Sequence, residues 1–216
     1  MSNRKFKEYT IWNAVSPQAV TSSTDATPIV VTKSSHGYST GDVVLIYGHA
    51  TNVAANGIYK ITKVNANSFS LQDVNTGANI AGSGAGAGSG GVMILSPKIV
   101  LAEDFVVAEL SISTASTATV TLKIAGSNGI ISPTSHGDTP NFGGTIDGTN
   151  QYSFLQIVNL DDSSTVNGST GIVVAGTNIN NLYEVNVNAI KYLTVIPVSW
   201  TQGSLTIKVK LLSGAK

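Results

Sequence analysis

Residues 35–73 read SHGYSTGDVVLIYGHATNVAANGIYKITKVNANSFSLQD, and this stretch decides the fold of the N-terminal part. Val43–Tyr47 is a short apolar run rich in β-branched residues, which is typical of a buried strand. Asn56–Gly57 is a strong turn signal, and the residues after it alternate between two faces. Phe69 and Leu71 alternate with serines, so we expect both side chains to point inward. The stretch therefore predicts three short strands joined by turns.

This stretch resembles a small β-barrel module that recurs in tailed-bacteriophage virion proteins and is similar to the FCCH-type barrel. The residues that carry the resemblance are His36-Gly37-Tyr38-x-Thr40-Gly41-Asp42-Val43-Val44, Asn56-Gly57-x-Tyr59-x-Ile61 and Asn67-Ser68-Phe69-x-Leu71. Such modules act as spacers or docking units and are not known for catalysis. The resemblance implies a virion protein whose partner is the major capsid protein or a tail protein.

The composition of the chain divides it into four expected parts. We expect an N-terminal arm at 1–20, the small barrel at 21–80, a linker at 81–91 and a β-sandwich at 92–216. The linker reads AGSGAGAGSGG, which offers no large side chain for burial and is typical of a flexible tether. It lacks the Lys-Ser/Thr ending of a phosphate-binding loop.

Short β segments separated by turn signals follow the linker, and they predict an antiparallel sandwich. The expected strands are 105–113, 118–127, 152–160, 171–175, 182–187, 192–198 and 205–211. Their order resembles the jelly-roll-like sandwiches of phage head and tail accessory proteins. The predicted fold class is therefore all-β, with a small N-terminal barrel and a C-terminal jelly-roll or Ig-like sandwich.

The charge content of the chain is low. Only 11% of the residues are charged, against about 25% in typical domains. The formal net charge is zero, which argues against a nucleic-acid partner and favours an assembled state. There are no cysteines, and the sequence shows neither a signal peptide nor an apolar run of membrane-spanning length. We therefore expect synthesis in a host cytoplasm and no membrane partner.

The chain contains three histidines, and none of them predicts a catalytic or metal site. His36 and His136 each lie in a Ser-His-Gly sequence, and His49 follows the first buried strand. A metal site needs several such ligands to converge, and a serine hydrolase of the α/β type needs a Gly-x-Ser-x-Gly elbow that is absent. We interpret all three as loop histidines and expect no enzyme activity, cofactor or metal.

Four aspartates lie in predicted loops and allow two readings. Asp161–Asp162, and Asp138 with Asp147, could bind calcium or serve glycoside hydrolysis, or they could be solvated turn residues. The solvated reading is favoured. The loop 126–151 is longer than ordinary connections, a length often found in functional or interface loops.

Aromatic residues are the candidates for an interface with a partner. In the N-terminal segment they stand among basic residues, which indicates either a docking arm or packing against the chain's own domain. The candidate interface residues are Phe6, Tyr9, Trp12, Phe142 and Trp200.

These observations lead to one expected function and two alternatives. The expected function is a non-enzymatic phage virion protein that decorates and stabilises the capsid as a homotrimer. One alternative is a tail component such as a tube, adaptor or baseplate protein. The other is a carbohydrate-binding or adhesion module that uses loop 126–151 and the aromatic residues.

Overall fold

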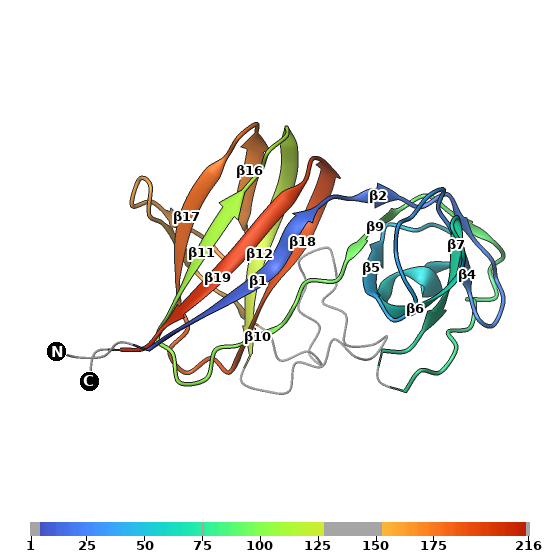
Figure 1. Ribbon diagram of the computed structural model, residues 1–216, viewed down its shortest axis with the longest axis horizontal. Coiled ribbons are helices and arrows are strands. Elements are labelled where there is room, and N and C mark those ends of the chain that lie inside the picture. The colour runs from blue at the N-terminus through green and yellow to red at the C-terminus, as the bar shows by residue number, and fades with distance from the viewer. Residues whose placement is uncertain (1–4, 75, 128–152, 215–216) are drawn as a thin grey trace. The chain divides into compact units, whose positions relative to one another are not determined.

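The computed structural model describes residues 5–74, 76–127 and 153–214 (Figure 1). These residues form two compact units: 17–74 with 76–96, and a second unit made of 5–16, 97–127 and 153–214. Within them the strands form three antiparallel sheets, and the helical content is a single 3-10 turn, η1 (Val53–Ala55). The all-β fold class predicted from the sequence is confirmed. The described residues include no helix long and apolar enough to span a bilayer.

The second unit is a β-sandwich of two sheets. Its six-stranded sheet has the order β1 (Phe6–Val15), β19 (Leu205–Leu212), β11 (Val107–Ser113), β17 (Asn180–Asn186), β14 (Ile157–Asn159) and β15 (Thr165–Val166). Figure 1 shows the first four of these strands side by side. The facing sheet has the order β10 (Val100–Leu101), β18 (Tyr192–Gln202), β12 (Ala118–Ser127) and β13 (Ser153–Phe154), with β16 (Ile172–Gly176) also paired to β12.

Alternating apolar side chains build the sandwich core, as the sequence predicts. In a strand, every second side chain points to the same face. The inward residues of β12 and β19 are all nearly inaccessible to solvent: Val120, Leu122, Ile124, Leu205, Ile207, Val209 and Leu211. Gly203 has a positive φ of 84° and lies in the hairpin turn between β18 and β19.

The prediction of an N-terminal arm at 1–20 is wrong, because most of that segment is a strand of the sandwich. β1 pairs antiparallel with β19, from Phe6 opposite Leu212 to Val15 opposite Leu205. A register shift between Thr10 and Trp12 breaks the alternation. As a result two successive residues, Ile11 and Trp12, are both buried. The small unit is therefore inserted into the sandwich between β1 and β10.

The inserted unit is a small closed barrel. Its sheet order is β2 (Gln18–Ala19), β9 (Val92–Leu95), β5 (Val43–Tyr47), β6 (Gly57–Asn65), β7 (Ser68–Gln72), β4 (Val30–Thr32), β3 (Ser22–Ser23) and β8 (Gly88–Ser89). β2 runs on into β3 and β8 runs on into β9, so the two ends of the sheet order belong to continuous stretches of chain and the sheet closes. The N–H of Val20 donates to the carbonyl of Gly91 at 3.0 Å and extends the β2–β9 pairing toward the β3–β8 pairing. Phe69 and Leu71 point into the core, as predicted.

The expected linker 81–91, called the glycine-rich segment below, also proves to be part of the barrel rather than a tether. It contains β8, and β9 after it pairs with β5. The carboxylate of Asp25 accepts hydrogen bonds from the N–H groups of Gly84 at 3.0 Å and Gly86 at 2.7 Å. A Cβ at Gly82 would collide with this carboxylate. Close approach of the backbone to Asp25 therefore requires glycine at 82, and the positive φ of 76° and 97° favours glycine at 84 and 86.

Candidate functional site

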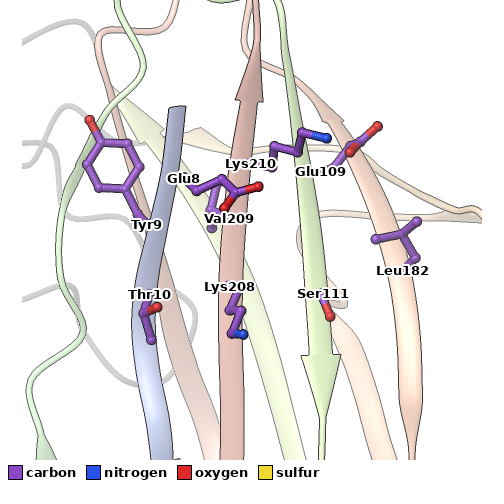
Figure 2. Close-up of a pocket in the computed structure, with 9 residues that line it drawn as sticks. All are labelled: Glu8, Tyr9, Thr10, Glu109, Ser111, Leu182, Lys208, Val209 and Lys210. Carbon is purple, nitrogen blue, oxygen red and sulfur yellow. The ribbon is translucent and has the colours of Figure 1, made fainter. Parts of the chain in front are cut away.

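The outer face of the six-stranded sheet carries a groove of about 390 Å³ (Figure 2). Its lining comes from β1, β19, β11 and β17, and is formed by Glu8, Tyr9, Thr10, Glu109, Ser111, Leu182, Lys208, Val209 and Lys210. Most of these side chains point outward because they alternate with the buried core residues of the same strands. The groove is therefore the solvent face of a sheet whose other face forms the sandwich core.

Strand register places the polar groups of the groove in two rows. Glu8 of β1 lies opposite Lys210 of β19, and Lys210 lies opposite Glu109 of β11. One step along the strands, Thr10, Lys208 and Ser111 form the second row. Neighbouring strands lie about 4.8 Å apart, so each lysine stands within reach of a group on either side.

The groove can bind a polar partner but shows no catalytic arrangement. Its charged groups are exposed or half-buried, and they are carboxylates and ammonium groups in alternation. Such groups form hydrogen bonds and ion pairs with a ligand or a protein surface, and exposed ion pairs contribute about 0–1 kcal/mol each. Sequence reasoning missed this site. The signal was present, because polar residues (Thr206, Lys208 and Lys210) occupy every second position of 205–211.

Two of the predicted interface residues, Phe6 and Tyr9, lie on β1 beside this groove. Phe6 is 63% exposed, and the Lys210 ammonium lies 5.4 Å from the centre of its ring. Tyr9 is half-buried and has the Lys7 ammonium 5.1 Å from its ring centre. Both contacts are within the range of cation–π attraction. Phe6 is therefore the more exposed of the two aromatic side chains, and Tyr9 contributes to the lining of the groove.

Trp12 and Trp200 are instead core residues of the sandwich. Each is 2% exposed, and their ring centroids lie 5.2 Å apart at an angle of 46°. The indole N–H of Trp200 donates to the carbonyls of Gln202 and Gly203 at 3.1 and 3.2 Å. Their aromatic surface is used inside the domain and is not offered to a partner. Phe142, with His136, Asp138 and Asp147, lies outside the described residues.

His49 lies outside the strands, as predicted, but it is a buried structural residue rather than a solvated loop histidine. Its Nδ1 lies 2.6 Å from the carbonyl of Gly90, which can only accept, so Nδ1 carries the proton. Its Nε2 then accepts from the Ser23 hydroxyl at 2.7 Å, and Asn52 donates to the same hydroxyl at 3.1 Å. A serine–histidine contact is the first element of a nucleophilic pair. Here Ser23 and His49 are only 2% and 3% exposed, so the pair is buried, and the bond from His49 to Gly90 ties the glycine-rich segment to the barrel.

His36 also lies in a loop, and it too is buried. Its Nδ1 accepts from the N–H of Tyr38 at 3.0 Å, and its Nε2 lies 3.0 Å from the carbonyl of Asn65. Its ring packs edge-on against Phe69, with centroids 5.2 Å apart. Burial, with a smaller contribution from the Asp42 carboxylate, raises the pKa of Tyr38 to about 12. The contacts of His36 with Tyr38, Asn65 and Phe69 hold the loop that contains His36 on the barrel.

Asp161 and Asp162 lie in the turn between β14 and β15, where the sequence predicts a loop, and both side chains are exposed. Hydrogen bonds from Ser164 hold the pKa of Asp162 below its usual range. In the described part of the chain, no three histidine or acidic side chains gather into a group that could hold a metal ion.

Comparisons with known proteins give no family for the chain. No protein-family model and no curated protein match it. Two solved structures are similar at a TM-score of 0.36. The SPBc2 prophage-derived protein YomS is 17% identical over 54% of this chain and 80% of its own. The PBSX exported protein XepA is 10% identical over 98% of this chain and 82% of its own. Likenesses at this TM-score do not bear on function.

Proposed function

We propose that this chain is a non-enzymatic structural protein of a phage virion, assembled in the host cytoplasm. In this proposal it is a head-associated decoration protein that binds the major capsid protein as a homotrimer. The resemblance of residues 36–71 to a virion barrel module supports the proposal. The low charge content, which suits extensive contact with neighbours, also supports it.

The observation that carries the proposal is the way the barrel is built into the chain. Each unit has its own core, and within the described residues the chain crosses between the units at Ser16–Pro17 and at Ser96–Pro97. Proline fixes its own φ and biases the residue before it towards an extended conformation. Two short crossings share any load that one unit transmits to the other, whereas a single glycine tether would not. This construction suits a protein that bridges two neighbours on a particle.

The test is to add the purified protein back to phage particles that lack it. The proposal predicts saturable co-sedimentation with the particles and release of packaged DNA at a higher temperature. Failure to bind particles at any protein concentration would contradict it. The double variant Pro17→Gly with Pro97→Gly tests the crossings. It should bind the particles normally but raise the temperature of DNA release less than the wild-type protein does.

The two alternatives predict different results. A tail component would bind in a few copies per particle and leave DNA release unchanged. In the carbohydrate-binding alternative, Trp200 cannot stack on a sugar, because it is buried in the core. A glycan array with the intact protein tests what remains of that alternative.

A further inference from the structure

The neutral net charge of the chain hides an uneven distribution of charge over the six-stranded sheet. No lysine or arginine occurs in the sequence between Lys123 and Lys191. β17, β14, β15 and the turn that joins the last two come from this interval. Their charged residues are Asp161, Asp162 and Glu184, and all three are acidic. One side of the sheet is therefore negative.

The other side of the same sheet is positive. β1 and β19 lie at the opposite end of the strand order from β14 and β15. With Lys5, just before β1, they carry four lysines (Lys5, Lys7, Lys208 and Lys210) against one glutamate, Glu8. Lys5 is held on the sheet by two hydrogen bonds, because its N–H donates to the Ser213 hydroxyl and its carbonyl accepts from the Ser213 N–H. Lys208 and Lys210 point to the outer face with Glu8, whereas Lys7 lies opposite the buried Leu211 and points to the other face of the edge strand β1. Over both faces this edge carries an excess of three positive charges, against three acidic groups on the far side.

Each charged side also exposes large apolar side chains. Phe6 is 63% exposed beside the lysines. On the acidic side Leu160 and Leu182 are 39% and 38% exposed, and the Leu160 N–H donates to the Leu182 carbonyl at 2.9 Å, so the two are neighbours. Charges around a small apolar centre are the ordinary anatomy of a protein interface.

We infer that the acidic edge (Leu160, Asp161, Asp162, Leu182 and Glu184) of one copy binds the basic edge (Lys5, Phe6, Lys7, Lys208 and Lys210) of the next copy. The occupant is a second copy because the two edges match in charge and in apolar character within one chain. An edge cannot pair with itself, since like charges would face each other. The contact is therefore head-to-tail, and it closes into a ring when the rotation between copies allows closure.

This inference rests on the self-association included in the proposed function, but the two can fail separately. A ring in solution could form from a protein that never binds a capsid. Conversely, particle binding could succeed through the barrel while neither edge contributes. The experiment below uses no phage particle, so it tests the edges alone.

Charge reversal of each edge, with the mass measured by light scattering, tests the inference. The variant Lys208→Glu with Lys210→Glu has two acidic edges, and the variant Asp161→Lys with Glu184→Lys has two basic edges. We expect the wild-type protein to be an oligomer and each variant alone to have the mass of one 22.2 kDa chain. An equimolar mixture of the two variants should recover association, because the unchanged acidic edge of the first variant meets the unchanged basic edge of the second. Recovery on mixing therefore shows that acidic edges pair with basic edges between copies.

Two further measurements keep the result unambiguous. The variant Lys60→Glu with Lys63→Glu makes the same charge change on exposed residues of β6 in the barrel and should keep the wild-type mass. Raising the salt concentration should dissociate the wild-type oligomer, because the contact depends on exposed charges. A wild-type protein that is monomeric at low salt would overturn the inference. Edge variants that are folded by circular dichroism and keep the wild-type mass would also overturn it.

Discussion

Replacing Trp12 with alanine tests whether the N-terminal segment is a structural strand of the sandwich. Trp12 is 2% exposed and packs against Trp200 with ring centroids 5.2 Å apart. Truncation of a buried tryptophan costs about 3–5 kcal/mol, and the aromatic contact is part of that cost. We expect Trp12→Ala to lower the free energy of unfolding of the sandwich by about 4 kcal/mol. If the segment were a solvated arm, the loss would stay below about 0.5 kcal/mol.

Urea unfolding followed by tryptophan fluorescence measures this loss. The chain has two tryptophans and both lie in the sandwich, so the signal reports that unit, and Trp200 remains as the reporter in the variant. With a denaturant slope of about 2 kcal/mol per molar urea, the midpoint should fall by about 2 M. Phe6→Ala, on the same strand but exposed, is the control and should leave the midpoint nearly unchanged. A midpoint for Trp12→Ala within about 0.25 M of the wild type would refute the assignment of this strand to the core.

Three further predictions concern the barrel. Asp25→Ala removes the carboxylate that holds the glycine-rich segment, so elastase should cleave that segment faster, while tryptophan-detected unfolding of the sandwich stays unchanged. Gly57→Ala places a Cβ 2.7 Å from the Tyr59 hydroxyl at a φ of 152°, and should destabilise the barrel by roughly 2 kcal/mol in thermal unfolding detected by near-UV circular dichroism; an unchanged melting temperature would contradict this. Burial raises the pKa of Tyr38 and of Tyr47 to about 12 from an unfolded value near 10, so their contribution to stability is complete below pH 10 and is lost as the pH rises towards 12. The part of the tyrosinate absorbance that comes from Tyr38 and Tyr47 should therefore appear together with barrel unfolding. Ionisation of these two tyrosines near pH 10 in an intact barrel would exclude this linkage.

The fold class and many strand positions could be predicted from the sequence because their signals are local. Val43–Tyr47 is a strand with the bounds that its apolar run indicates, and 205–211 alternates as β19 requires. Where the chain changes sheets within one apolar run, the same signals were insufficient. The predicted strand 152–160 is in fact β13 and β14, which pair in different sheets.

The insertion of the barrel could not be predicted, because it depends on pairing between distant segments. β1 reads as a charged and aromatic segment, and nothing near it indicates that its partner is β19 at the other end of the chain. The glycine-rich segment was misread for a related reason. Its contacts are backbone hydrogen bonds to Asp25, and these leave no apolar pattern in the sequence.

The groove and the two charged edges follow from the same long-range pairing. The lysines of β19 were visible in the sequence, but the position of Lys210 between Glu8 and Glu109 exists only once three distant strands are in register. The candidate interface residues were chosen by aromatic character alone. That criterion found the exposed Phe6 and also selected Trp12 and Trp200, whose size suits a core equally well.

The copy number of this protein in purified mature phage particles tests the central claim most directly. Quantitative mass spectrometry against the major capsid protein gives that number. A head decoration protein should occur in many copies, in a fixed proportion to the major capsid protein and in multiples of the solution oligomer. Absence from particles in cells that produce the protein would contradict a virion role. A few copies per particle would contradict the head assignment.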